Sequence, residues 1–311
     1  MPVDENPLNV VLCWHMHQPD YRGPDGSDYE LPWVYLHALK DYSDMASHLE
    51  AHEGGRAVVN FAPVLLEQIE DYSLQVRRWL KNGKRISDPL LAALAGPDLS
   101  IDIEARKKLI RECLRANETH LIHRFEAFHD LVDIVNWAEQ RQDAFGYLND
   151  QFLVDLLVWY HLAWTGESIR QKDIRIASLE KKKRNFDLED RRQLLSVIDE
   201  TLTNLIGRYR NLAESGRIEL SVTPYAHPIM PLFNGFQVAR ESAPEMELPE
   251  ADDYPGGEER AKWHVHMGLE SFGRHIVIRL VGCWSSEEAM SVVALGLLEG
   301  EVFCWVENGQ M

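Results

Sequence analysis

Short apolar runs alternate with amphipathic stretches near both ends of the chain. The first run, NVVLCW, covers residues 9–14, and comparable runs lie at 57–61, 218–222, 275–283 and 302–306. Continuously apolar runs of this length are typical of parallel strands that are covered on both faces. Residues 35–52 repeat apolar side chains at helical spacing, and a second helix is expected from Pro63, because proline is tolerated in a first turn.

The middle of the chain breaks this alternation. Residues 104–140, 149–164 and 187–215 have helical periodicity without a strand between them, and Asp187 is expected to cap the third of these helices. The alternation resumes after Gly216, with helices expected near 258–272 and 287–298. The sequence therefore predicts one α/β domain over residues 1–311, with a mainly parallel sheet and a long helical insertion at about 100–215.

Composition and charge narrow the classes of partner. The 311 residues are 45% hydrophobic, which is ample for a core, and they carry a formal net charge of −18. Because nucleic-acid binding requires a basic surface that displaces counterions from phosphates, this charge argues against a nucleic-acid partner. A neutral or cationic partner fits better.

Cysteine usage and the N-terminus indicate the compartment. The four cysteines have no CxxC spacing and are interpreted as buried, reduced thiols: Cys13, Cys113, Cys283 and Cys304. The N-terminus is acidic, and its apolar run is too short for a signal peptide or a membrane anchor. We therefore expect a cytoplasmic protein that does not bind a membrane.

Polar side chains cluster at the ends of the predicted strands. Since the carboxyl ends of parallel strands share one edge of a sheet, such residues are expected to gather at one rim. The candidates, in chain order, are His15, His17, Gln18, Asp20, Asn60, Glu219, Tyr225, His227, Trp284, Ser286 and Glu287.

The histidines allow two interpretations. Imidazoles two residues apart on an extended chain project to the same side, so His15 and His17 could form half of a metal site, with His227 as a third ligand. This reading predicts a metal-dependent hydrolase. The alternative is that these side chains only satisfy hydrogen bonds of the fold.

Glu219 lies inside a strand-like run. Alternation places Ile218, Leu220 and Val222 on one face of IELSV, and Glu219 with Ser221 on the other. In a barrel, Glu219 could point into the lumen near the mouth and bind sugar hydroxyls. The alternative is an exposed position at a sheet edge.

Trp284 and Glu287 follow the fourth run. Trp284 can form an apolar wall, and Glu287 is expected in the first turn of the next helix, where the helix dipole favours an anion. An ionised carboxylate beside an aromatic ring suits attack on an anomeric carbon. The alternative is a capping box with acidic residues at a helix start.

These residues, in this order, resemble the motifs of glycoside hydrolase family 57, whose members act on α-glucans as amylases, glucanotransferases and branching enzymes. The stretch HMHQP from His15 resembles the first signature of that family, GRIELSVTPYAHPI from Gly216 the second, and WSSE from Trp284 the third. The resemblance extends over essentially the whole chain. It implies an incomplete (β/α)7-type barrel that lacks its last strands and its C-terminal helical region.

The resemblance also implies roles for individual residues. Glu287 would be the nucleophile of a retaining reaction, and His17, Glu219 and Trp284 would line the subsite for the transferred glucose. His15 and His227 would support them. The implied substrate is an α-1,4-glucan or maltooligosaccharide, and the family uses no metal or other cofactor. In retaining enzymes a second carboxylic acid stands ~5 to 5.5 Å from the nucleophile and acts as acid and base.

The sequence departs from the family pattern in two places. No aspartate follows Glu287, where the acid/base of the family would lie, so the activity is expected to be impaired. Ser285 and Glu288 replace the proline and glycine that are usual in the third signature. These departures leave a second hypothesis open: a catalytically inactive glucan-binding module or a truncated gene product.

Overall fold

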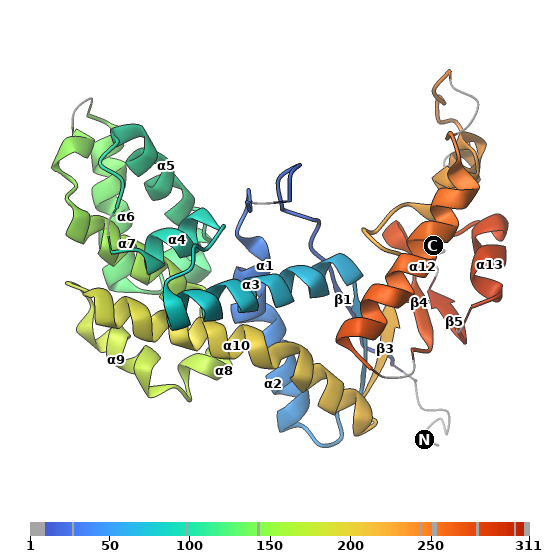
Figure 1. Cartoon of the computed structure of the whole chain (residues 1–311), viewed down its shortest axis with the longest axis horizontal. Helices are drawn as coiled ribbons and strands as arrows, with labels where there is room; N and C mark the ends of the chain where they lie inside the picture. The colour runs from blue at the N-terminus through green and yellow to red at the C-terminus, as the bar shows by residue number, and fades with distance from the viewer. Residues whose placement is uncertain are drawn as a thin grey trace, which may run out of the picture. The chain divides into compact units, whose positions relative to one another are not determined.

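The fold is known from a computed structural model, shown in Figure 1. It describes residues 10–26, 28–97, 99–141, 144–242, 244–250, 254–277, 280–301 and 303–307, apart from the side chains of residues 241, 242 and 288. The strands are β1 (Cys13–Met16), β2 (Ala57–Phe61), β3 (Ile218–Val222), β4 (Gly282–Trp284) and β5 (Trp305–Glu307).

Helices make up most of the remaining ordered elements. The α-helices are α1 (Trp33–His37), α2 (Ser43–Ala51), α3 (Pro63–Asn82), α4 (Pro89–Ala95), α5 (Ile103–Cys113), α6 (Glu126–Glu139), α7 (Asp150–Ala163), α8 (Glu167–Arg170), α9 (Ile174–Lys182), α10 (Leu188–Glu214), α11 (Ala239–Ser242), α12 (Gly257–His275) and α13 (Val292–Glu299). The π-helical segments are η1 (Ala38–Tyr42) and η2 (Glu118–Ile122). The 3₁₀ segments are η3 (Ala144–Tyr147), η4 (Met230–Asn234), η5 (Phe236–Val238) and η6 (Ser286–Glu288).

The strands form one parallel sheet in chain order, β1-β2-β3-β4-β5, within the described part of the chain. This order, with helices between successive strands, confirms the predicted α/β class with a parallel sheet. It is the order in which the strands of a (β/α) barrel follow one another.

Three predicted strand boundaries are wrong. The run at 9–14 is a strand only from Cys13, and Val10 and Val11 before it are each 71% exposed, not buried as the prediction requires. The run at 275–283 contributes only its last residues to β4: His275 ends α12, and residues 278–279 lie outside the described residues. The last strand begins at Trp305, later than expected.

The two faces of the sheet differ in chemistry. One face is buried, and it carries Val59, Phe61, Leu220 and Val222, with Tyr209 of α10 packed edge-on against Phe61. We call the other the polar face. Across it, in register, run His15, Asn60, Ser221, Gly282 and Trp305 on successive strands. Alternation along each strand separates an apolar side from a side that can carry a site.

Residue contacts divide the chain into two compact units. The sheet unit comprises Met1–Asp20, Leu49–Gln68 and Ile206–Met311, and the helical unit comprises Tyr21–His48 and Ile69–Leu205. The expectation of one domain over residues 1–311 stays a prediction. The helical unit begins well before the insertion that was expected at about 100–215.

The helix expected over 104–140 is divided into three segments. Helix α5 ends at Cys113, and Asn117 then takes an extended conformation and accepts a hydrogen bond from the backbone N–H of His120 at 2.8 Å. An asparagine with this geometry is an N-cap that starts a new helix. The other end signals are confirmed, since Asp187 caps α10 through Asp190 and Gly216 follows with φ of +67°.

The cysteine interpretation is half wrong. Cys113 and Cys283 are buried, whereas Cys13 and Cys304 are exposed, and all four are free. Cys13 belongs to the polar face and Cys304 immediately precedes the short strand β5, which explains why an apolar neighbourhood in sequence did not bury them. Among the residues that the structure describes, none of the helices has the length and hydropathy to cross a bilayer.

A buried histidine in the helical unit makes its stability depend on pH. His161 of α7 donates from Nδ1 to the carbonyl of Leu157 at 2.7 Å, and its Nε2 accepts from the hydroxyl of Tyr35 at 3.0 Å. Burial lowers the pKa of His161 to about 4. A neutral imidazole satisfies both contacts, whereas a protonated one would lose its acceptor.

Because the folded pKa of His161 lies below the unfolded value, its contribution to stability is complete above about pH 6.5 and is lost as the pH falls towards 4. We expect wild type to lose a few kcal/mol relative to His161→Gln as the pH is lowered from 7 to 4.5. Urea unfolding of both proteins across this range measures the difference. Asp88, whose pKa burial raises to about 6, is common to both proteins and cancels. A difference that does not change with pH would contradict the assignment.

Candidate functional site

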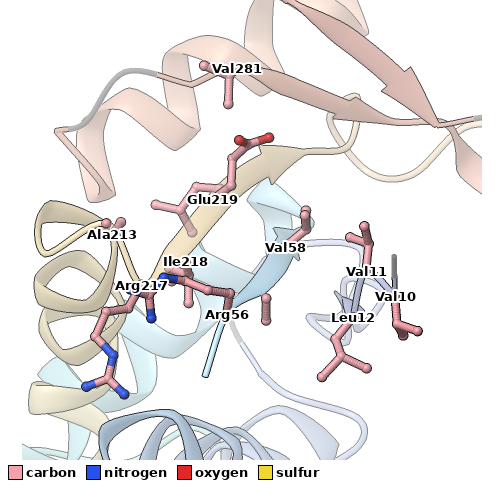
Figure 2. A pocket seen from close by; sticks show the side chains of 13 residues that line it. Val10, Val11, Leu12, Arg56, Val58, Ala213, Arg217, Ile218, Glu219 and Val281 are labelled. Atoms are coloured by element: carbon pink, nitrogen blue, oxygen red, sulfur yellow. The ribbon is translucent and has the colours of Figure 1, made fainter. Parts of the chain in front are cut away.

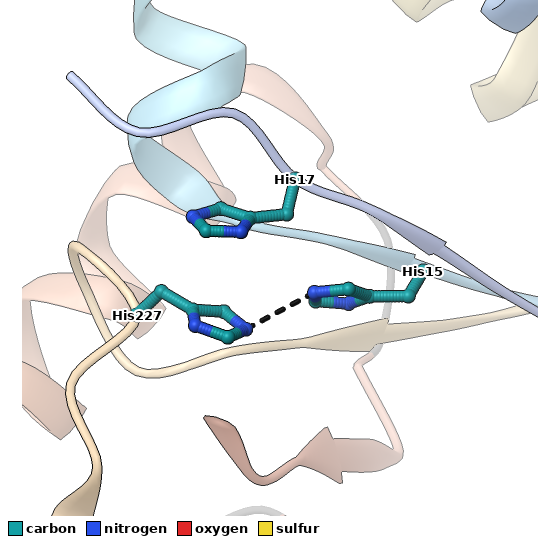
Figure 3. Close-up of side chains that lie close together, drawn as sticks. All are labelled: His15, His17 and His227. Atoms are coloured by element: carbon teal, nitrogen blue, oxygen red, sulfur yellow. Dashed lines mark hydrogen bonds between the residues drawn. The ribbon is translucent and has the colours of Figure 1, made fainter. Parts of the chain in front are cut away.

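Three imidazoles from two distant parts of the sequence converge at the C-terminal end of the sheet (Figure 3). His15 is the third residue of β1, so it lies within the strand and not after it as expected, and His17 follows the strand end. His227 comes from the loop after β3, and its Nε2 lies 3.0 Å from Nε2 of His15. The rings of His17 and His227 stack with centroids 4.0 Å apart. We call these three residues the histidine cluster.

The loop that presents His227 is held by hydrogen bonds and carries backbone strain. Ala226 and His227 have φ of 60° and 57°, a left-handed conformation that is uncommon for residues other than glycine. The preceding Tyr225 donates its N–H to the carbonyl of His264 at 2.9 Å, and its own carbonyl accepts from the His264 ring at 2.6 Å. Its hydroxyl donates to Glu67 at 2.9 Å. These contacts with α12 and α3 keep the loop in its strained conformation.

Buried polar groups of the sheet orient His15. Asn60 donates from Nδ2 to Ser221 at 3.1 Å, and its Oδ1 accepts from the hydroxyl of Thr223 at 2.9 Å. The same Oδ1 lies 2.6 Å from Nδ1 of His15, so Nδ1 is the protonated nitrogen of this imidazole. Nε2 of His15 therefore carries a lone pair directed toward His227.

The environment keeps two members of the histidine cluster neutral. Burial, together with the neighbouring His15, lowers the pKa of His17 to about 4. Burial, followed by the effects of His17 and His15, lowers the pKa of His227 to about 4 as well. At pH 7 both rings can therefore donate one hydrogen bond and accept another.

Trp284 joins the histidine cluster from β4. It is the last residue of that strand, and its ring stacks on His15 with centroids 5.3 Å apart and planes 18° from parallel. The fold thus brings together four of the six residues singled out for substrate contact or catalysis: His15, His17, His227 and Trp284.

Glu219 lies at another level of the sheet. It pairs with Val58, whereas His15 pairs with Asn60, two residues later on the same strand. Glu219 therefore lies on the polar face two residues nearer the N-terminal ends of the strands than His15 does. There it lines a pocket of about 520 Å³ at the N-terminal ends of the strands, which Arg56 and Arg217 also line (Figure 2). The structure does not place it in the histidine cluster, although the predicted alternation of faces in β3 holds.

The indole of Trp305 contacts Glu219 across the polar face. Its Nε1–H donates to the Glu219 carboxylate, which requires the ring to pass over β4. A Cβ atom on Gly282 of that strand would lie 2.1 Å from the indole, so only glycine leaves room for this crossing. Glu219 therefore has a structural partner in the described chain.

Glu287 is not in the first turn of a helix. It lies in η6 with φ of 53° and ψ of 25°, and its side chain is exposed. Helix α13 begins only at Val292, after Ser291 caps it by accepting from Ala294 at 3.2 Å. The expected stabilisation of Glu287 by a helix dipole is therefore wrong, because Glu287 lies in a separate 3₁₀ turn before α13 begins.

A buried serine fixes the turn that carries Glu287. Ser285 is 1% exposed and donates from Oγ to the carbonyl of Glu307 in β5 at 2.8 Å. This contact ties the segment after β4 to the next strand. In the sequence Ser285 was a departure from a motif and a candidate cap for the next helix, whereas the structure assigns it a supporting contact with β5.

Three supporting residues were not predicted as parts of the site. Glu67 and His264 hold Tyr225 from two helices, and Thr223 helps to orient Asn60. The residues next to them in the sequence do not indicate this role, because each one contacts a partner that is far away in the sequence.

The fold and the cluster define an α/β protein with neutral imidazoles and an indole at the C-terminal ends of parallel strands. The model of glycosyl hydrolase family 57 matches residues 11–306, and the chain therefore belongs to this family. No curated protein sequence matches the chain significantly.

Among solved structures, the chain is similar to an α-amylase and to two branching enzymes of family GH57. The α-amylase AmyC from Thermotoga maritima is 12% identical, with a TM-score of 0.46 over 95% of this chain and 38% of that one. Branching enzymes from Thermococcus kodakaraensis and Pyrococcus horikoshii are 14% and 15% identical, each with a TM-score of 0.37 over 89% of this chain. They are covered over 32% and 34% of their length, so this chain spans about a third of the proteins it resembles.

Proposed function

We propose that the chain binds α-1,4-glucans and carries the nucleophile of a retaining glycoside hydrolase or transglycosylase. The observation that supports this most is the meeting of the histidine cluster with Trp284 at the C-terminal end of the sheet. Membership in glycosyl hydrolase family 57 supports the reaction class.

The proposed subsite suits a sugar ring chemically. The indole of Trp284 offers an apolar face for the C–H groups of a glucose unit, and neutral imidazoles can both donate to and accept from hydroxyl groups. Glu287, in the turn that follows Trp284, attacks the anomeric carbon and forms a glycosyl-enzyme. His15 and His227 support the residues of this subsite. Glu219 is proposed to line the subsite for the transferred glucose, from its position two residues before Ser221 on β3.

We propose that the 311 residues alone have low catalytic activity toward glucans. No aspartate follows Glu287 in the sequence, and a general acid typically contributes about 10²- to 10⁴-fold. The second candidate is therefore a glucan-binding module without catalysis. The exposed, left-handed Glu287 favours this candidate, because its carboxylate lies outside the first turn of α13, where a helix dipole would stabilise it.

Calorimetric titration with maltoheptaose tests the proposed binding. We expect Trp284→Ala to weaken binding by about 10-fold or more, which corresponds to the ~1.4 kcal/mol that a well-placed aromatic ring contributes. Trp137→Ala is the matched control, since Trp137 is 49% exposed on α6 and stacks only with Arg141 among the contacts described here. Maltoheptaose that fails to bind wild type, or that binds all three proteins equally, would refute the proposal.

A further inference from the structure

The histidine cluster has the composition of a transition-metal site. One nitrogen from each of His15, His17 and His227 lies within 4.8 Å of the others. Imidazole suits zinc, copper and nickel, and three protein nitrogens with an open fourth position are a common zinc arrangement. We propose that these three residues bind a divalent transition-metal ion such as Zn²⁺, and that the bound ion blocks the glucan subsite. The blocking effect rests on the proposed function, whereas metal binding does not.

The spacing of two ligands is close to what a metal requires. Zinc–nitrogen bonds of ~2.0 to 2.1 Å in a tetrahedral site put neighbouring ligand atoms about 3.3 Å apart. Nε2 of His15 and Nε2 of His227 are 3.0 Å apart, so a small outward shift admits the ion between them. His17 stacks on His227 and is only half buried, so rotation about its side-chain bonds can turn a nitrogen toward the same point.

The surroundings of His15 match those of metal-binding histidines. Such histidines usually donate the ring N–H that faces away from the metal to an oxygen acceptor, which fixes the tautomer and the ring orientation. Asn60 provides this acceptor for Nδ1 of His15, and it is itself held by Ser221 and Thr223. Nε2 of His15 is left as the coordinating atom.

The position of the His227 ring is also fixed before any ion binds. The left-handed pair Ala226 and His227 follows Tyr225, which is held by His264 and Glu67. A metal ion would replace the hydrogen bond between the two Nε2 atoms with two coordinate bonds. Because the ring is already positioned, little side-chain entropy is lost on binding.

A metal ion at this place would compete with a sugar. Trp284 stacks on His15, so the face that would receive a glucose ring adjoins the nitrogen that would coordinate the ion. Coordination would also engage the lone pairs that the proposed subsite uses to accept bonds from hydroxyl groups.

Titration of the untagged chain with zinc chloride tests the metal site. We expect one ion per chain, and affinity reduced at least about 30-fold in His15→Ala and His227→Ala, because each change removes one of three ligands. His129→Ala is the control. The His123 and His129 rings lie 4.5 Å apart beside Asp133 and Glu118, so they form an exposed surface pair that could bind zinc weakly. Circular dichroism melting curves without metal establish that each variant is folded.

The outcomes separate the claims. Absence of saturable zinc binding, or equal loss in His129→Ala and the cluster variants, would overturn the metal site. Maltoheptaose affinity that falls about 10-fold or more when zinc is bound would support blocking. Unchanged maltoheptaose affinity would overturn blocking but leave the site. Maltoheptaose that never binds would refute the proposed function alone, and glucan cleavage that increases with zinc would overturn inhibition in favour of a metal-dependent hydrolase.

Discussion

Glu287→Gln is expected to slow fluoride release from α-maltosyl fluoride by about 10³-fold or more relative to wild type. Fluoride leaves without a proton, so this substrate tests the nucleophile without requiring the acid that the family pattern places on an aspartate. The Glu287 carboxylate would form a bond to the anomeric carbon as the carbon–fluorine bond breaks. A fluoride electrode measures the rate for both proteins.

Product stereochemistry sharpens this test. With azide added, wild type should give the α-glycosyl azide through two inversions, whereas Glu287→Ala should give the β-anomer through one. Glu301→Gln is the control, because Glu301 is an exposed carboxylate just after α13. If wild type and Glu287→Gln released fluoride equally slowly, Glu287 would not be the nucleophile, and the binding-module hypothesis would gain.

Gly257→Ala is expected to lower the free energy of unfolding by about 3 kcal/mol, a large value for one added methyl group. Gly257 is the first residue of α12 and is buried. A Cβ atom there would lie 1.8 Å from the carbonyl oxygen of Phe233, a backbone atom that cannot rotate away. The start of α12 would have to shift, and with it the helix that holds Tyr225 through His264.

Gly273→Ala in the same helix provides the comparison. A Cβ atom on Gly273 would meet nothing within 4 Å, so this substitution should stabilise the chain by up to about 1 kcal/mol through helix propensity. Urea unfolding of both variants gives the two values. The same sign for both substitutions would show that the close approach to Phe233 does not determine the stability of α12.

The alternation of apolar and polar residues predicted correctly which face of a strand each side chain occupies. The alternation of Ile218, Glu219 and Leu220 placed Glu219 on the polar face, as the structure has it. Its level along the strand could not be read from the sequence, because register is set by pairing with Val58 on a strand far away in the chain. The same limit moved His15 from the loop into β1.

The errors around Glu287 have a different cause. A serine followed by two glutamates is a typical helix start, so the sequence favoured a helix there. In the structure Ser285 bonds to β5 instead, and a second serine, Ser291, caps α13. Both serines could cap a helix in this segment. The contact of Ser285 with β5, which the local sequence does not reveal, leaves Ser291 as the cap.

The two left-handed residues at positions 226 and 227 hold the loop in one backbone conformation. A ligand that reaches this place finds the imidazole already aimed, so the free and occupied forms of the chain should superimpose there. The entropy of ordering the loop is then lost once, when the polypeptide folds, and not again at each encounter with a ligand.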